Sequence, residues 1–439
     1  MESWDIVIVG GGPAGLTAGA RAAQRGKRTL LLEKNRRPGV KILLSGGTRC
    51  NFTHAADARG IVEAFGPSGR FLHSALAAFG PQDVVDFFQS EGVPAKIEPD
   101  TGKIFPSSDQ AADVLSALIN RLNKSGCTLA TEETLLEMER SVDGFNLITS
   151  RRAISAEKIL LATGGKSYPA CGTTGDGYRW AAALGHTVVP LHAALAPVVT
   201  HAPWVTALQG ITIPDVLVKV VEPLDEKKGT GPICAKHPLG RAGKLDLSPF
   251  SIQIRRLASR RGSFLFTHFG VSGPAVLDVS RTISGYSPAQ MLILQCDFLP
   301  DVKPEELDAT IAAQCASAGG RQVSVILDGR LPRRLADALL EQAEVPLKRR
   351  GAELSKPERR RLVMAIKQWP IPVAGTMGFR KAEVTAGGVA LDEVDSRTMQ
   401  SKIVPGLFFA GELLDLDGPI GGYNFQAAFS TGYLAGESM

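Results

Sequence analysis

Three glycines and one acid near the N-terminus have the types and the spacing needed to bind a dinucleotide. Gly10, Gly12 and Gly15 follow the G-x-G-x-x-G spacing, and Glu33 lies 23 residues beyond Gly10. In such a turn the first glycine permits the bend and the second lets a pyrophosphate approach. The third lets helix and strand pack closely. An acid at this distance binds the ribose hydroxyls of an adenosine. The pattern therefore predicts a bound dinucleotide.

The surrounding residues predict the elements that such a site requires. An apolar strand over 6–9 precedes the glycines, and an Ala-rich helix over about 13–25 follows them, opening with Pro13 and Ala14. Its N-terminus offers unpaired N–H groups and a partial positive charge to phosphates. A second strand, 29–32, delivers Glu33. The negative charge of Glu33 disfavours a 2′-phosphate. Basic side chains follow it, Lys34 among them, so NADP as the bound dinucleotide is not excluded.

Two later segments could hold the other end of a long cofactor. A strand near residue 160 ends in Ala162-Thr163-Gly164-Gly165, and a strand over 407–410 ends in Gly411-Glu412. The latter feeds Gly421-Gly422-Tyr423-Asn424 and a helix rich in small residues. FAD commonly draws its binding groups from both ends of a chain, unlike a nicotinamide dinucleotide. There is no second G-x-G-x-x-G, so a dedicated NAD(P)H domain is not expected, although NAD(P)H remains open as the electron donor.

Several stretches together resemble one bacterial family of FAD-binding flavoproteins, the BaiN-like or aminoacetone-oxidase-like family. The resemblance runs from residue 5 to about 436, in the family's order. The stretches are GGGPAGL, GVKILLSGGTRCNF, ATGGKSYPACGTTGDGY, FTHFGVSGPAVL, TAGGV and FFAGELLDLDGPIGGYNFQAAFSTG. The first and last are shared with many FAD proteins, whereas SGGTRCN and SYPACGTTGDGY are more particular.

The resemblance implies an α/β, Rossmann-like FAD-binding domain of the two-dinucleotide-binding type, with two insertions. We expect this domain over 1–190 and 372–439, a β-rich insertion over 191–300 and a small helical insertion over 301–371. The resemblance also places the adenosine near Glu33 and the isoalloxazine near Ser45–Asn51 and Gly422–Gln426. The expected cofactor-binding residues are Gly10, Gly12, Pro13, Ala14, Gly15, Glu33, Lys34, Lys41, Ser45, Gly46, Gly47, Asn51, Ala162, Thr163, Gly164, Gly165, Gly411, Glu412, Gly422, Asn424, Phe425 and Gln426.

The chain departs from the family pattern at one position. The family has a third glycine in Ser-Gly-Gly-Gly-Arg-Cys-Asn, where this chain has Thr48. A β-branched residue is strained at positive φ. We therefore expect strain in this loop if the position adopts a left-handed conformation.

A flavin supplies hydride or electron chemistry, and reduction of a C=C bond also needs a proton donor. Three residues are candidates. Cys50 lies beside Arg49, which could lower its pKa, but it could equally be a buried inert thiol. Tyr168 and His268 could each donate a proton or serve only in packing and hydrogen bonding. We expect the N-terminus of the helix near Asn424 to stabilise the reduced flavin through its dipole.

The bulk composition predicts a soluble, cytoplasmic protein. Hydrophobic residues make up 44% and charged residues 21% of the 439, as in ordinary globular proteins. No apolar run reaches the roughly 18 residues of a membrane helix, and no signal peptide opens the chain. Six scattered cysteines predict neither a zinc site nor a disulfide framework. Oligomeric state cannot be predicted from this composition.

The net charge of +5 is unevenly distributed, and this bears on the substrate. Residues 236–261 contain seven Lys/Arg and one acidic residue, and residues 321–367 contain twelve Lys/Arg and six acidic residues. The first hypothesis is an enzyme that delivers hydride from flavin N5 to an activated C=C bond of a small molecule. The basic segments favour an alternative, reduction of uridine to dihydrouridine in ribosomal RNA, unless they are ordinary solvated surface. The family label suggests a third option, an FAD-dependent amine oxidase.

Overall fold

The computed structural model describes residues 2–223 and 254–439. Cys234, the Gly/Pro/Lys-rich segment 225–249 and the basic residues of 236–253 lie outside the described residues. The chain divides into two compact units. The first unit combines Met1–Ala194 with Phe379–Met439, and the second unit is Leu195–Gly378.

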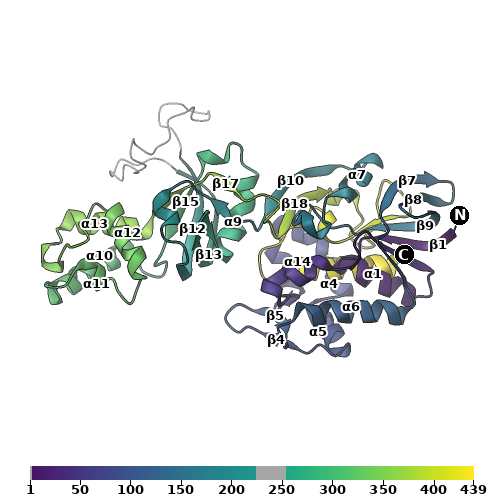
Figure 1. Cartoon of the computed structure of the whole chain (residues 1–439), viewed down its shortest axis with the longest axis horizontal. Helices are drawn as coiled ribbons and strands as arrows, with labels where there is room; N and C mark the ends of the chain where they lie inside the picture. Colours follow the sequence, from purple (N-terminus) through teal and green to yellow (C-terminus); the bar gives the residue numbers. More distant parts are fainter. Residues whose placement is uncertain (1, 224–253) are drawn as a thin grey trace. The chain divides into compact units, whose positions relative to one another are not determined.

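A seven-stranded sheet forms the centre of the first unit (Figure 1). The main path runs β6-β2-β1-β9-β8-β7, and β19 also pairs with β9. The strands are β1 (Glu2–Val9), β2 (Thr29–Glu33), β6 (Thr128–Thr131), β7 (Leu135–Ser141), β8 (Gly144–Thr149), β9 (Ala153–Leu161) and β19 (Leu407–Phe409). β1, β2, β6, β9 and β19 are parallel. Except for the partly exposed edge strand β6, they contain apolar, buried runs, as a sheet covered on both faces requires. Their carboxyl ends therefore share one edge, where doubly wound folds bind ligands.

Strand β9 joins the early and late parts of the chain. One edge pairs with β1 along most of its length. Along the other edge, residues 153–156 pair with β8 and residues 159–161 pair with β19. The C-terminal strand thus lies one strand away from the first strand, so the two glycine-rich turns that follow them are neighbours.

The first and last helices pack with their backbones in direct contact. These are α1 (Pro13–Gln24) and α14 (Tyr423–Ser438). A Cβ on Gly432 would lie 2.3 Å from the carbonyl oxygen of Ala14, and one on Gly436 would lie 2.6 Å from that of Ala18. Arg21 also forms an ion pair with Glu437. Only glycine permits this approach, because any side chain at these positions would hold the helices apart.

The remaining elements of the first unit complete its shell. The helices are α2 (Val40–Leu44), α3 (Ala58–Ala64), α4 (His73–Ala78), α5 (Pro81–Ser90), α6 (Ala111–Ser125) and α7 (Asp176–Ala183). The small sheet β3-β5-β4 contains Thr53–His54, Lys103–Pro106 and Ala95–Ile97. Strands β10 (Val188–Ala194) and β18 (Val384–Val389) pair antiparallel. Helices α1 and α6 pack together, and α6 also contacts α2.

The second unit is built on one antiparallel sheet. The order is β16-β15-β12-β13-β14-β11-β17. The strands are β11 (Val198–Val199), β12 (Thr212–Pro223), β13 (Ile254–Thr267), β14 (Gly270–Ser272), β15 (Ile293–Asp297), β16 (Trp369–Pro372) and β17 (Gly375–Thr376). Helix α9 (Pro274–Ser284) packs against β12 and β13. α8 (Pro203–Thr206) is a single turn.

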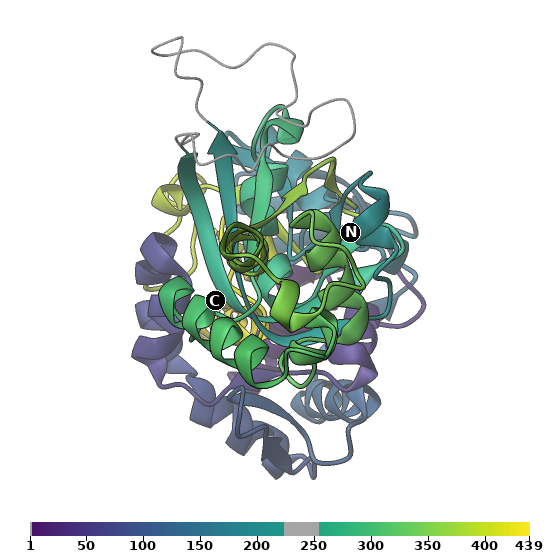
Figure 2. The ribbon, with the colours of Figure 1, turned by 90° about the vertical axis from the view of Figure 1, so that its left-hand side faces the viewer.

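Four helices gather beside each other in the same unit (Figures 1 and 2). They are α10 (Pro304–Ser317), α11 (Val323–Ile326), α12 (Arg333–Gln342) and α13 (Lys356–Lys367). Helix α13 begins with a capping box, in which the Glu358 amide donates to the Ser355 hydroxyl. The buried residues of these helices and of the sheet form one continuous hydrophobic cluster.

One element differs from the sequence-based expectation. Helix α9 was not predicted, because its Val- and Ile-containing sequence sits among strands and helix periodicity over 11 residues is a weak pattern. Helix α14 begins at Tyr423, close to the expected start near Asn424, and Gly422 at φ +91° is its N-cap. Among the described residues, no helix is long and apolar enough to cross a membrane.

Replacing Gly432 with alanine will destabilise the first unit, because the added methyl group must displace the backbone of α1. Overpacking of this kind costs about 1–3 kcal/mol, and we expect a lower midpoint in thermal unfolding. Gly320→Ala is the matched control, because a Cβ there meets nothing within 4 Å. Equal midpoints for the two variants would contradict the backbone contact.

Candidate functional site

The glycine-rich turn after β1 has the close contacts expected of a dinucleotide-binding turn. Gly10 has φ +110°, and a Cβ there would lie 2.5 Å from the carbonyl oxygen of Ala162. A Cβ on Gly15 would lie 1.9 Å from the carbonyl oxygen of Gly10. By contrast, a Cβ on Gly12 would meet nothing within 4 Å. Gly12 is the N-cap of α1, with no side-chain cap and no acid in the first turn, so the helix N–H groups face open space.

Glu33 lies at the end of β2, directly beneath this turn. Its side chain is buried, and its two oxygens accept hydrogen bonds from the backbone N–H groups of Gly11 at 2.9 Å and Asn35 at 2.7 Å. Burial raises the pKa of the Glu33 carboxyl, and these two backbone donors oppose the rise. A carboxylate can accept about four hydrogen bonds. Glu33 therefore keeps acceptor capacity at the position where the sequence predicts a ribose.

A partly buried polar network connects α2, the loop after β9 and the segment after β19. The Lys41 ammonium donates to the Ser167 hydroxyl at 2.7 Å and to Glu412 Oε2 at 2.6 Å. The Ser167 hydroxyl donates to Glu412 Oε1 at 2.8 Å. The Thr385 N–H donates to the same oxygen at 2.9 Å. Two residues expected to bind the cofactor, Lys41 and Glu412, thus lie in contact with each other.

Thr385 holds the loop after β9 against β18. Its hydroxyl oxygen accepts from the backbone N–H groups of Lys166 at 2.8 Å and Ser167 at 3.1 Å. Gly165 must be glycine for this contact, since a Cβ there would lie 2.4 Å from the Thr385 hydroxyl. From the other side, Lys34 donates to Thr174 and Asp176, both at 2.6 Å. The ammonium of Lys34 therefore restrains the same loop.

The loop over residues 45–50 adopts repeated left-handed conformations. Gly46, Gly47 and Thr48 have φ values of +55°, +66° and +72°. The Thr48 side chain is exposed. This confirms the expected strain, since a left-handed non-glycine residue costs about 1–3 kcal/mol. Strain of this size persists where surrounding structure enforces it, and it commonly marks functional loops.

Cys50 does not have the properties of a reactive thiol. Its side chain is fully buried, and burial raises the pKa of the thiol to about 12. The expectation that Arg49 lowers this pKa is wrong. The Arg49 guanidinium instead lies 4.0 Å from the centre of the Phe105 ring and pairs with Glu98 at 2.9 Å.

The N-terminus of α14 lies against strand β3. A Cβ on Gly422 would lie 2.4 Å from the carbonyl oxygen of Thr53. Asn424 closes the preceding turn, exchanging hydrogen bonds with the backbone of Gly418. The Gln426 side chain is completely buried and fully used inside the protein, since it accepts from Thr53 and donates to Phe79 and Ser430. Only its backbone is left to face a ligand. Phe425 stacks on Phe429 with ring centres 6.0 Å apart.

The two other candidate proton donors have different surroundings. Tyr168 is half-buried at φ +53°, and within the described residues its hydroxyl has no hydrogen-bond partner. Burial, together with the negative charge of Glu383, raises the pKa of Tyr168, so its phenol stays protonated at neutral pH. His268 belongs to the second unit, where it is exposed in the turn of the β13–β14 hairpin. Its proposed role stays a prediction.

Sequence reasoning missed three residues that the structure brings into the site. Ser167 and Thr385 hold Glu412, although both lie in stretches that carry the family resemblance. His54 stacks on Tyr423 with ring centres 4.6 Å apart, and burial lowers its pKa. A lone Ser, Thr or His in a single sequence gives no pattern from which a long-range contact can be predicted.

Among the residues expected to bind the cofactor, two buried polar atoms have no partner within the described residues. They are Asn51 Oδ1 and Thr163 Oγ1. Buried polar atoms are normally hydrogen-bonded, so each of the two is available to a bound molecule. Together with the open space at Gly12, these atoms show that the residues present fit a dinucleotide cofactor.

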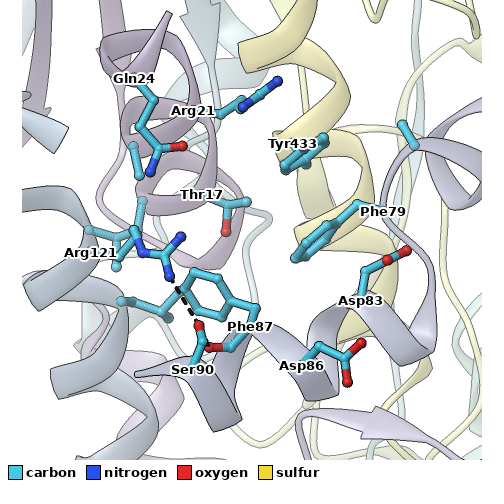
Figure 3. Close-up of a pocket in the computed structure, with 14 residues that line it drawn as sticks. Thr17, Arg21, Gln24, Phe79, Asp83, Asp86, Phe87, Ser90, Arg121 and Tyr433 are labelled. Atoms are coloured by element: carbon cyan, nitrogen blue, oxygen red, sulfur yellow. Dashed lines mark hydrogen bonds between the residues drawn. The ribbon is translucent and has the colours of Figure 1, made fainter. Parts of the chain in front are cut away.

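A separate cavity of about 390 Å³ lies in the first unit (Figure 3). The described residues that line it are Leu16, Thr17, Ala20, Arg21, Gln24, Ala78, Phe79, Asp83, Asp86, Phe87, Ser90, Leu118, Arg121 and Tyr433. None of these is a residue expected to bind the cofactor. Its charged groups already have partners in the chain, as when Arg121 donates to Glu91 and Ser90. This cavity is therefore distinct from the dinucleotide site.

The glycine-rich turn, the buried acid at the end of β2 and the C-terminal strand–turn–helix define a Rossmann-type dinucleotide-binding protein. The chain belongs to the HI0933-like family, whose Rossmann-domain model matches residues 4–438. It is an FAD-dependent oxidoreductase.

The similar proteins include two with different substrates in their names. The ribosomal RNA dihydrouridine synthase of Escherichia coli strain K12 is 33% identical, covering 100% of this chain and 98% of that protein. The 3-dehydro-bile acid delta(4,6)-reductase of Clostridium scindens is 31% identical, covering 99% and 98%. Among solved structures, a 3-ketosteroid-delta4-(5alpha)-dehydrogenase from Rhodococcus jostii RHA1 is similar at 15% identity and a TM-score of 0.49, covering 100% and 96%.

We predict that Cys50 will resist alkylation in the native protein. With a pKa of about 12, only about one thiol in 10,000 is ionised at pH 8, and the thiolate is the reactive form. Reactivity will rise as the pH approaches 12 or when the protein is unfolded in urea. The measurement is peptide mapping by mass spectrometry after iodoacetamide treatment, with the half-exposed Cys171 as the internal reference. Faster labelling of Cys50 than of Cys171 at pH 8 would contradict the buried environment.

Proposed function

We propose that this oxidoreductase reduces a C=C bond conjugated to a carbonyl group. Reduced flavin, when bound, supplies a hydride to the carbon β to the carbonyl. A proton is then needed at the α carbon, so that the sum is addition of two hydrogens across the double bond. NAD(P)H is the proposed reductant that restores the flavin, and it acts without a second dinucleotide-binding domain.

The names of the similar proteins support this reaction class. Forming dihydrouridine saturates the C5=C6 bond of a uracil, which is conjugated to the C4 carbonyl. A delta(4,6)-reductase of a 3-dehydro bile acid acts on double bonds conjugated to the C3 carbonyl. The two proteins are about equally similar to this chain, at 33% and 31% identity. What they share is the reaction class and not the size of the substrate.

The main support for this reaction is the phenol of Tyr168, which could donate the required proton. Its phenol is protonated at neutral pH and has no partner among the described residues. It follows Ser167, which contacts both Lys41 and Glu412. A left-handed Tyr is conformationally costly, and the Tyr168 N–H donates to the Phe379 carbonyl at 2.9 Å, which helps to hold it there. We propose that Tyr168 donates the proton to the α carbon.

Tyr168→Phe will lower turnover by roughly a hundredfold or more, since general acids contribute about 10²–10⁴-fold. FAD binding will be unchanged. In stopped-flow measurements, oxidation of the reduced enzyme by an enone will slow, whereas reduction by NAD(P)H will not. Tyr433→Phe, which removes a hydroxyl in the separate cavity, is the control. Equal slowing of both half-reactions in Tyr168→Phe would argue against the assigned role.

Uridine in RNA is the second candidate substrate, favoured by the charges of the second unit. Between residues 321 and 360 this unit exposes six basic side chains that form neither an ion pair nor a hydrogen bond within the described residues: Arg321, Arg330, Lys348, Arg350, Lys356 and Arg360. The bridge between Gln322 and Arg350 brings Arg321 and Arg350 close together. Exposed, unpaired cations are the groups that bind phosphates.

Other basic residues of the same segment are already used inside the protein. Arg359 forms an ion pair with Asp308 at 2.8 Å, and Arg361 donates to the Ala343 carbonyl at 2.8 Å. Arg255 and Arg261 also pair with acids. Reversing the charge at Arg359 or Arg361 would therefore test folding as much as RNA binding.

The triple substitution of Lys348, Arg350 and Arg360 by Glu will weaken binding to structured ribosomal RNA. If three phosphate contacts are lost, the slope of log affinity against log salt will fall by roughly 2. Fluorescence anisotropy at several salt concentrations measures this slope. Reduction of a small enone serves as the control and will be unchanged. An unaltered salt slope would count against RNA as the substrate.

A further inference from the structure

The carboxamide of Asn51 can face in only one direction. Its side chain is buried, with 8% of the residue exposed. The Nδ2 group donates to the carbonyl oxygens of Thr53 and Ile104, both at 2.9 Å. An oxygen in that position would face two acceptors, so the amide orientation follows from chemistry. Asn51 Oδ1 is therefore an obligate acceptor.

This acceptor is buried and has no partner among the described residues. Leaving a buried acceptor unsatisfied costs about 1–3 kcal/mol. The two hydrogen bonds of Nδ2 hold the side chain in place, so Oδ1 cannot turn to find a partner within β3 or β5. The donor must come from outside the described residues, and a bound molecule or an ordered water can supply it.

Asn51 lies beside the N-terminus of α14. It bonds to Thr53, whose hydroxyl donates to Gln426 of that helix at 2.6 Å, and whose carbonyl lies against Gly422. The first turn of α14 has no side-chain cap and no acid. A helix N-terminus attracts partial negative charge. A hydrogen-bond acceptor, Asn51 Oδ1, therefore lies beside a helix N-terminus that favours a carbonyl oxygen of a ligand.

One edge of the isoalloxazine ring has the complementary pattern. Its pyrimidine ring carries two carbonyl groups, at C2 and C4, on either side of N3–H. In the oxidised ring N3–H is the only N–H donor. An obligate acceptor facing the ring can thus be satisfied only at N3, with a carbonyl oxygen directed toward the helix.

We propose that Asn51 Oδ1 accepts the hydrogen bond of flavin N3–H and so positions the pyrimidine edge of the ring at α14. The inference rests on the proposed function, because that function requires a flavin ring in this part of the first unit. It adds the protein atom that would bind the ring, Asn51 Oδ1, and the orientation of the isoalloxazine that this contact would impose.

Comparing FAD with 3-methyl-FAD tests the contact directly. The two cofactors have the same adenosine and pyrophosphate, so any difference in affinity arises at N3. Apoprotein is titrated with each, and quenching of flavin fluorescence measures binding. We expect 3-methyl-FAD to bind at least tenfold more weakly. Equal affinities would overturn the contact while leaving the proposed function intact, whereas failure to bind FAD at all would overturn the proposed function itself.

Two variants give a further readout. Asn51→Ala removes the acceptor and leaves room for a methyl group, so the affinities for the two cofactors will converge to within about twofold. Asn146→Ala is the control, because Asn146 is exposed on β8 and is not among the residues expected to bind the cofactor. It will keep the tenfold discrimination. Persistent discrimination in a folded Asn51→Ala protein would overturn the proposal, and the comparison in the unsubstituted protein still decides if that variant does not fold.

Discussion

The direct backbone contact between α1 and α14 is the constraint on which the site depends. Gly432 and Gly436 let the last helix lie against the carbonyl groups of Ala14 and Ala18. The same approach brings the turn after β19 beside the turn after β1, where a Cβ on Gly411 would lie 3.0 Å from the Cβ of Ala14. A side chain between the helices would separate the two ends of the chain, and with them the two halves of the cofactor site.

Hydrogen-bond saturation separates the structural polar residues of the site from those available to a ligand. Gln426 and Asn424 use their carboxamides internally, and Thr385 and Ser167 are occupied in holding Glu412. Asn51 Oδ1 and Thr163 Oγ1 are buried and unpaired among the described residues. Since an unsatisfied buried polar atom is costly, these two atoms of the site are available to pair with a bound cofactor.

The same reasoning distinguishes the candidate chemical groups. Cys50 is sealed in the core, and its raised pKa makes it inert. Tyr168 is strained, half-buried and protonated, with a free hydroxyl among the described residues. The basic residues of the second unit divide in the same way, into cations paired with acids, such as Arg359, and exposed cations, such as Arg360, that remain available to phosphates.

The sequence alone determined the dinucleotide turn, the helix and strands around it, the acid at Glu33 and the strain at Thr48. These features are local, since they follow from glycine spacing, apolar runs and backbone preferences over a few residues. Only the tertiary structure decided that Cys50 is buried, that Lys41 meets Glu412, and that Asn51 holds an unpaired acceptor. Those properties depend on contacts between residues tens to hundreds of positions apart, and the solvation of a side chain is set by whatever the fold packs around it.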